Sequence, residues 1–441
     1  MKKIVLSLFL FALTANMVAE DHVMAATKRA PERDVPATLN LSLTEAQDYA
    51  IETNRSLRNA DLAVQKAYAS RWQTIASMLP SVDMSWAFQS MMGYKMNFGT
   101  MPIDMPDNGT LGITAAVGIN GQAIVGALLN NVAIDMQKLN LEQSEDNLRA
   151  NIKTSYASVL VLQNVVTLLE NSLANIEQMA AMTQRSVDVG AAEQTTADLI
   201  NVRANTLRNN INANLRSTQL ALNALKVLLD VPAETELQLT TTLEDVLSAE
   251  TVLQLLGNEF ILENNLNYQL LEKNVELAEK NVHMAGWAYG PTIGVGYQYS
   301  KKDYFGQKEG FNMTPPNAFS VQVSMPLWSS GKRAAGVVEK KIALEEARNT
   351  FAETTNNLGI QNDQLRYNLQ NAYETFTNEQ ENMGVTQRVF DNTTRKFQQG
   401  AASNLDLVNA SNDLITAQSS YVQAVLTLVN AQVELEKFLN L

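Results

Sequence analysis

The sequence predicts a mainly α-helical protein with a small β part, built from long coiled-coil helices and four short strands. Three observations lead to this fold class. Long stretches without proline carry apolar residues at spacings of three and four, the repeat of an amphipathic helix. Two short segments, each opened by a proline, alternate instead between apolar and polar residues, the repeat of a strand. The third observation is an internal duplication.

The duplication relates the two halves of the chain residue by residue. Pro80 and Pro291 lie 211 positions apart, and so do Asn54 and Asn265. The apolar positions after the two prolines also pair at this offset: Val82 with Ile293, Met84 with Val295, Trp86 with Tyr297, and Phe88 with Tyr299. Because self-similarity at a fixed offset indicates repeated architecture, each half is predicted to contain the same order of elements.

Four strands are expected, two in each half. Pro80 and Pro291 end the preceding helices, because the residue before a proline resists the helical conformation. The predicted strands are about 81–90, 110–119, 292–300 and 319–327. Their shared apolar face consists of Val82, Met84, Trp86, Phe88, Ile113, Val117, Ile293, Val295, Tyr297, Tyr299, Phe319, Val321 and Val323.

The helices are expected to be unusually long. The first begins at the capping box Ser42 to Glu45 and runs to about Met78, with an interruption near Asn54. Each pair of strands is followed by a long helix and then a second one: 122–188 with 196–229, and 332–398 with 404–439. The longest would measure roughly 100 Å at 1.5 Å per residue. In the last helix an alanine recurs every seven residues, a heptad that produces a left-handed supercoil.

Composition excludes several classes of function. The 441 residues carry a formal net charge of −13, which argues against nucleic acid as a partner because a phosphate-binding face is basic. The absence of cysteine excludes disulfides, thiolate metal sites and a lipid anchor on cysteine. His283 has no companion histidine, and no phosphate-binding loop or catalytic constellation is present. We therefore expect no enzyme activity, cofactor or metal.

The first residues read as a signal peptide, placed at 1–25. Two lysines precede an apolar run from Ile4 to Leu13, and small residues follow. The run is too short to remain in a bilayer, and nothing later offers about eighteen uninterrupted apolar residues. We therefore expect an exported protein without a transmembrane helix.

The strands suit a membrane barrel. About nine alternating residues suffice for a tilted strand to cross a bilayer. Three of the four tryptophans, Trp86, Trp287 and Trp328, fall in or beside the strand pairs, and aromatic residues at strand ends mark membrane interfaces. A small sheet on a helical body is the alternative. Because four strands cannot close a barrel and open edges are not tolerated in hydrocarbon, several chains are expected to share one barrel.

Two segments carry a resemblance to a known family. "AVQKAYASRWQTIASMLPSVDMSWAF" and "NVELAEKNVHMAGWAYGPTIGVGYQY" each contain a helix that ends in proline and opens a strand. With the two helical turns described below, they resemble the TolC-like outer-membrane efflux proteins over essentially the whole mature chain. The resemblance implies a homotrimer with a shared twelve-stranded β-barrel in the bacterial outer membrane. It also implies that the helices form an α-barrel tunnel in the periplasm.

The family resemblance also implies function and partners. Such a protein is the passive exit duct of a tripartite efflux or type I secretion system, exporting small molecules or proteins. The implied partners are a periplasmic adaptor (membrane fusion protein), an inner-membrane transporter of the RND or ABC class, and outer-membrane lipid. The alternative is a periplasmic or surface structural coiled-coil protein. The expected organisation is a signal peptide at 1–25, an N-terminal extended segment at 26–41, a first repeat at 42–229, an equatorial segment at 230–250, and a second repeat at 251–441.

Two turns between helices are the candidate functional positions. Gly190 and Gly400 are placed to end one helix, Thr195 and Ser403 to cap the next, and Asp198 and Asp406 follow three residues after these caps. Helix capping alone would explain this pattern.

The resemblance gives the same turns a second interpretation, as the tip of the tunnel. Asp406 lies six residues after Gly400, the spacing of the aspartates that line the family's periplasmic aperture, whereas Asp198 lies eight after its glycine. Asn201 and Asn409 occupy the places of a second aspartate ring. Phe397 and Ala402 stand where some members carry a Tyr and an Arg that lock the tip, so that lock is not expected.

Overall fold

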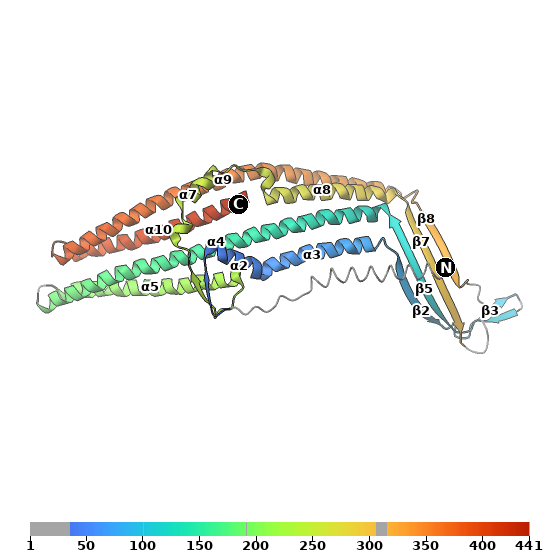
Figure 1. Cartoon of the computed structure of the whole chain (residues 1–441), viewed down its shortest axis with the longest axis horizontal. Coiled ribbons are helices and arrows are strands. Elements are labelled where there is room, and N and C mark those ends of the chain that lie inside the picture. The colour runs from blue at the N-terminus through green and yellow to red at the C-terminus, as the bar shows by residue number, and fades with distance from the viewer. Residues whose placement is uncertain (1–35, 100, 191, 306–314, 441) are drawn as a thin grey trace. The chain divides into compact units, whose positions relative to one another are not determined.

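The computed structural model describes residues 36–440, except 100, 191 and 306–314 (Figure 1). The predicted signal peptide and most of the predicted segment 26–41 lie outside the described residues. The chain forms two compact units. Among the described residues, the first unit contains 61–139 and 270–352, and the second contains the remainder. The units cut across the two predicted repeats, because each repeat contributes to both.

The first unit contains a four-stranded antiparallel sheet. Its strands are β2 (Ser81–Gln89), β5 (Asn108–Asn120), β7 (Thr292–Tyr304) and β8 (Asn317–Ser324), in the order β2-β5-β7-β8. All four predicted strands are therefore present. β8 ends at Ser324 instead of 327, because Pro326 has no N–H group for the ladder.

A second, smaller pair of strands was not expected. β3 (Lys95–Phe98) pairs with β4 (Met101–Asp104) between the predicted strands 81–90 and 110–119. β7 is also longer than predicted, because it continues to Tyr304 opposite Asn108 of β5. Strands of four residues contain too little alternation to be recognised in the sequence.

The long helices agree with the prediction to within two residues. They are α4 (Gly121–Asp188), α5 (Gln194–Leu229), α9 (Lys332–Gln398) and α10 (Asn404–Leu439). The helices that lead into the sheet are α3 (Arg55–Ala76) and α8 (Leu266–Gly286), the latter followed by the short 3-10 helix η2 (Trp287–Tyr289). α4 lies beside α5, and α9 lies beside α10, so each long helix runs next to the one that follows it in the chain (Figure 1). The helix expected from Ser42 to Met78 is interrupted at Asn54, as predicted.

The second unit has two hydrophobic cores along the long helices. One contains Tyr156 of α4, Leu225 of α5, Leu369 of α9 and Leu428 of α10, each fully buried. The other contains residues of the same four helices, and its members include Met179, Leu207, Phe390 and Leu414. Because all four helices contribute to both cores, this part of the chain is held together by coiled-coil packing.

Short elements surround the first of these cores. β1 (Thr38–Leu41) pairs in parallel with β6 (Glu236–Leu239), and three short helices complete the group: α2 (Leu43–Thr53), α6 (Leu243–Val246) and α7 (Ala249–Gly257), with the 3-10 turn η1 (Leu262–Asn264) after them. The hydroxyl of Tyr156 donates to the carbonyl of Leu41 at 2.9 Å and accepts from the N–H of Thr241 at 3.0 Å. One buried side chain on α4 thereby fixes the strand pair to the core.

A buried asparagine joins two helices at the start of α3. The side-chain oxygen of Asn54 accepts from the backbone N–H groups of Ser56 at 2.8 Å and Leu57 at 3.1 Å. Its amide nitrogen donates at 2.8 Å to the carbonyl of Leu228, near the end of α5. One side chain therefore satisfies free donors of one helix start and a free acceptor of one helix end.

The duplication repeats this arrangement in the second half. Asn265 accepts from the N–H groups of Asn267 at 3.1 Å and Tyr268 at 3.3 Å. Its amide donates at 2.9 Å to the carbonyl of Phe438, near the end of α10. The duplication predicted from the sequence thus extends to individual hydrogen bonds.

Among the described residues, one helix, α4, is long and apolar enough to cross a membrane, by length and composition only. It contains an 18-residue window of mean hydropathy 1.3, although the stricter sequence criterion had found no such segment. Of that window, 44% is buried inside the chain. α4 also contributes residues to both hydrophobic cores, so part of its apolar surface is used in packing.

Candidate channel-forming elements

The register of the four-stranded sheet collects the predicted apolar residues on one face. Residues directly opposite each other in antiparallel strands point to the same side. Val117 lies opposite Val295, and Val295 lies opposite Val321. The further rows continue this face: Ile119, Ile293 and Val323; Val82, Ala115, Tyr297 and Phe319; Met84, Ile113 and Tyr299; Trp86 and Leu111. Phe88 follows Trp86 by two residues, so all thirteen predicted residues share the face.

The other face of the sheet is small and polar. One of its rows contains Ser81, Ala116, Gly296 and Ser320, and another contains Thr114 and Gln298. Many of the apolar side chains opposite are exposed in the single chain, among them Met84 at 76% and Phe319 at 70%. A face of this size and hydrophobicity requires a partner or a lipid environment.

Both outer strands of the sheet have an open edge. β2 pairs only with β5 and β8 only with β7 in the part of the chain that the structure describes. An exposed apolar strand with unpaired N–H and C=O groups is a template for another strand. The sheet is therefore incomplete as it stands in one chain.

The junction between β5 and α4 contains a close contact that the sequence analysis missed. β5 ends at Asn120, and α4 begins at the next residue, Gly121. The side-chain oxygen of Asn120 accepts from the N–H of Ala123 at 2.7 Å, which caps the new helix. A Cβ atom on Gly121 would lie 2.1 Å from Cε3 of Trp287, so only glycine fits. A glycine at a predicted strand–helix boundary was the available signal.

The second helical turn has the predicted capping structure. Gly400 has φ +72°, the left-handed conformation expected of a helix end. Ser403 caps α10, and its backbone N–H and hydroxyl donate to Oδ2 of Asp406 at 2.9 and 2.7 Å. In return the N–H of Asp406 donates to the Ser403 hydroxyl at 3.1 Å. The side-chain and backbone hydrogen bonds from Ser403 lower the pKa of Asp406, so this carboxylate stays ionised.

The first turn departs from the prediction. Gly190 has φ +75° as expected, but the cap of α5 is Glu193 and not Thr195. Glu193 makes no side-chain cap hydrogen bond, and the Thr195 hydroxyl donates to Oε2 of Glu193 at 3.2 Å. In both turns the cap lies three residues after the glycine, so α5 begins two residues earlier than predicted and Asp198 is not part of a capping box. Instead Asp198 accepts from Nε2 of Gln194 at 2.9 Å.

The two turns lie at the same end of the second unit. Ile200 and Leu407, close to the two aspartates in sequence, are buried in one hydrophobic core. The predicted aperture residues Asp198, Asn201, Asp406 and Asn409 are all exposed. Phe397 packs against the same core, and neither Phe397 nor Ala402 carries a hydroxyl group or a charge.

The sheet and the long helices together indicate a class of protein. A sheet with one apolar face and two open edges, continuous with helices of 67 and 68 residues, is suited to a membrane channel extended by a helical coiled coil. In the part of the chain that the structure describes, no group of three or more His, Asp or Glu side chains could hold a metal ion.

Comparisons with known proteins agree with this class. Residues 259–441 match the family described as outer membrane efflux protein. Outer membrane efflux protein BepC of Brucella suis biovar 1 (strain 1330) is 25% identical over 347 residues, which cover 75% of this chain and 72% of that protein.

Solved structures with the same fold come from several bacteria. The outer membrane protein VceC from Vibrio cholerae superimposes with a TM-score of 0.72 at 15% identity, covering 90% of this chain and 95% of that chain. The CmeC outer membrane channel of Campylobacter jejuni gives a TM-score of 0.70 at 14% identity, covering 94% and 90%. The resemblance to TolC-like outer-membrane efflux proteins is therefore confirmed. Residues 259–441 are similar to the outer membrane efflux protein family, and the chain as a whole has the fold of these channels.

Proposed function

We propose that the protein is the passive exit duct of a tripartite export system. Three copies would contribute their four strands each to one barrel in the outer membrane, and the long helices would form a tunnel in the periplasm. The observation that carries this proposal is the sheet with one apolar face and two open edges. Closing a barrel between copies removes both edges and places the apolar face in lipid. β2, β5 and β7, with 9, 13 and 13 residues, are long enough to cross the bilayer, and β8 has 8 residues.

In such a trimer the two turns would supply the periplasmic aperture. Three copies of Asp198 and Asp406 bring six carboxylates to one opening, bordered by Asn201 and Asn409. A ring of carboxylates raises the local concentration of cations and excludes anions. The lowered pKa of Asp406 supports this role, because its hydrogen bonds from Ser403 favour the charged carboxylate.

The partners follow from the same proposal. A duct without its own energy source requires a periplasmic adaptor and an inner-membrane transporter of the RND or ABC class. The names of the matched family and of the Brucella relative describe efflux, which favours small toxic molecules over secreted proteins as cargo. The segment 230–250 would be equatorial, between the two repeats.

The aperture is tested by the double substitution Asp198→Asn with Asp406→Asn. Asparagine keeps an acceptor for the helix start and removes the charge, so the trimer should assemble. In planar bilayers we expect the reversal potential in a salt gradient to move toward zero, and block by divalent cations from the periplasmic side to weaken. Asp413→Asn, an exposed aspartate on the same helix α10, is the matched control. Unchanged selectivity with lower thermal stability would mean that the aspartates are only caps.

The remaining alternative is a structural coiled-coil protein outside the membrane. Carbonate extraction of cell envelopes separates the two. A barrel protein stays with the outer-membrane pellet, whereas a peripheral rod is released into the wash. Release of the intact protein would contradict the proposed duct.

A further inference from the structure

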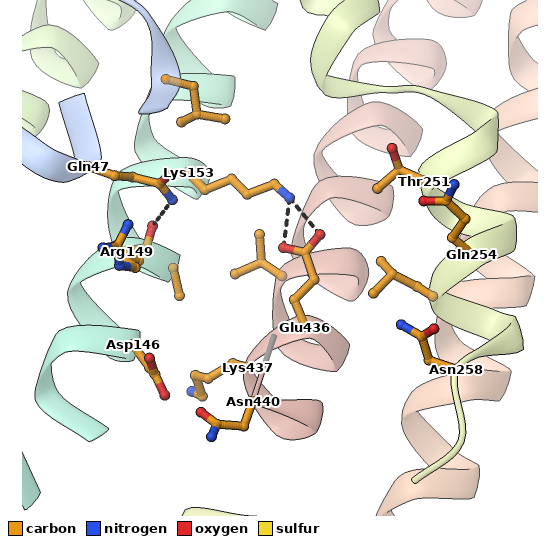
Figure 2. Close-up of a pocket in the computed structure, with 14 residues that line it drawn as sticks. Gln47, Asp146, Arg149, Lys153, Thr251, Gln254, Asn258, Glu436, Lys437 and Asn440 are labelled. Carbon is orange, nitrogen blue, oxygen red and sulfur yellow. Dashed lines mark hydrogen bonds and ion pairs between the residues drawn. The ribbon is translucent and has the colours of Figure 1, made fainter. Parts of the chain in front are cut away.

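A pocket of about 450 Å³ lies within the second unit, between α2, α4, α7 and α10 (Figure 2). Asp146, Arg149 and Lys153 of α4 line one side, and Thr251 of α7 and Asn258, the residue that caps its end, face them. A volume of this size falls in the range of small-molecule sites, about 300–1,000 Å³. Nothing in the proposed duct uses this pocket, because its residues belong neither to the sheet nor to the tip turns.

Every basic side chain of the lining already has a carboxylate partner. Nζ of Lys153 donates to both carboxylate oxygens of Glu436 at 2.7 Å, which also neutralises that glutamate (Figure 2). Lys437 lies 3.8 Å from a carboxylate oxygen of Glu434. The pocket therefore offers no uncompensated positive charge from its lysines.

Arg149, the remaining basic residue of the lining, is also paired with carboxylates. Arg149 lies 3.4 Å from a carboxylate oxygen of Asp48 on α2 and 3.5 Å from one of Glu145 on its own helix. Since each base is paired, an anionic ligand would have to break an existing ion pair to bind.

Asp146 is the lining carboxylate with an unsatisfied oxygen, although the charge of Arg149 partly offsets its own. Its Oδ2 atom is buried and accepts no hydrogen bond from the residues that the structure describes. Burial raises the pKa of this carboxyl, and the like charges of Glu142 and Glu145 add to the effect. A buried acceptor without a donor costs stability, and a donor that carries a positive charge is its best partner.

We propose that this pocket binds a small organic ligand with a primary ammonium group and a short apolar body. The ammonium group donates to Asp146, and the body lies against Leu43, Leu255 and Val433, the apolar part of the lining. Asn258, on the opposite side of the pocket from Asp146, offers an amide group to a polar group at the other end (Figure 2). A bare metal ion fits less well, because the volume exceeds one ion and no group of three or more acidic or His side chains among the described residues could hold it.

Three probes with the same five-carbon chain test the ligand class: 5-aminopentan-1-ol, pentane-1,5-diol and 5-hydroxypentanoate. Each is titrated into the purified full-length protein in detergent and followed by ligand-observed NMR. We expect the amine to bind with a Kd on the order of 1 mM, a usual range for a fragment of this size. The diol and the carboxylate should bind at least tenfold more weakly. Equal binding of amine and diol, or preference for the carboxylate, would overturn the proposal.

Two variants connect the binding to the pocket. Asp146→Asn should weaken binding of the amine at least tenfold, whereas Glu170→Gln, which removes one exposed charge from the same helix, should leave it unchanged. Gln254→Phe places a large side chain at the pocket lining and keeps Asp146, so it should abolish binding by occlusion. Amine binding that survives both Asp146→Asn and Gln254→Phe would place the ligand elsewhere and end the proposal.

Discussion

Single side chains decide how the helices of this protein begin and where they are joined. Ser403 with Asp406 forms a capping box, and the serine followed three residues later by an acid is visible in the sequence. Glu193 at the start of α5 carries no comparable signature, which is why Thr195 was the wrong prediction. Asn54 and Asn265 were recognised as a repeated pair, but their bonds to the ends of α5 and α10 join residues far apart in the chain. No local pattern encodes such a contact.

Asp146 gives a prediction about stability and pH. Its pKa in the folded protein is raised, mainly by burial, above the value in the unfolded chain. Within the window between these two pKa values the folded state binds more protons, so stability falls as pH rises through it. Above the window the ionised carboxylate destabilises the fold, and below it both states are protonated and the effect is absent.

Asp146→Asn should therefore raise the melting temperature at pH 8 and lose this advantage as the pH is lowered through the window. Melting curves of the purified protein, followed by circular dichroism at several pH values, measure the difference. A variant less stable than the parent at pH 8 would show that the carboxylate has a partner in the assembled protein. A stable variant also ensures that loss of amine binding does not reflect misfolding.

At the level of elements, periodicity was sufficient for the long helices and the four main strands, because each shows many repeats of its pattern. The short pairs β1 with β6 and β3 with β4 were beyond such reasoning, since four residues give only two on each face. The register of the sheet follows from the alternation, because a slip of one residue would move every apolar side chain to the polar face. The alternation does not show whether the apolar face contacts lipid or protein.

The junction between β5 and α4 makes a prediction at this scale. Gly121→Ala places a Cβ atom 2.1 Å from Trp287, against ring atoms close to the base of that side chain, so the strand and helix must shift. Gly126→Ala on the same helix meets only an ordinary contact of 3.8 Å with Thr74. The helix preference for alanine should make this control neutral or more stable by about 1 kcal/mol. The yield and melting temperature of the purified protein should therefore fall for Gly121→Ala and stay the same or rise for Gly126→Ala.

For the whole molecule, the two faces of the sheet should tolerate charge differently. Val295 lies in the apolar row between Val117 and Val321, so Val295→Arg would place a charge in lipid at a cost of about 2–4 kcal/mol near the bilayer midplane. Gln298 on the same strand belongs to the polar face, and Gln298→Arg should assemble and change conductance. The amount of heat-resistant trimer in outer membranes measures the first effect. Equal tolerance of both substitutions would contradict the barrel.

The unequal capping of the two tip turns has a mechanical consequence. One helix start is held by a reciprocal pair of hydrogen bonds, and the other has no side-chain cap bond, although duplication made the two turns from the same plan. In a ring of three chains, the firmly capped starts of α10 would alternate with the weakly capped starts of α5 around the opening. The opening would then have three-fold and not six-fold symmetry. When the opening is forced to widen, the three α5 helix starts would move or unravel before the three α10 helix starts.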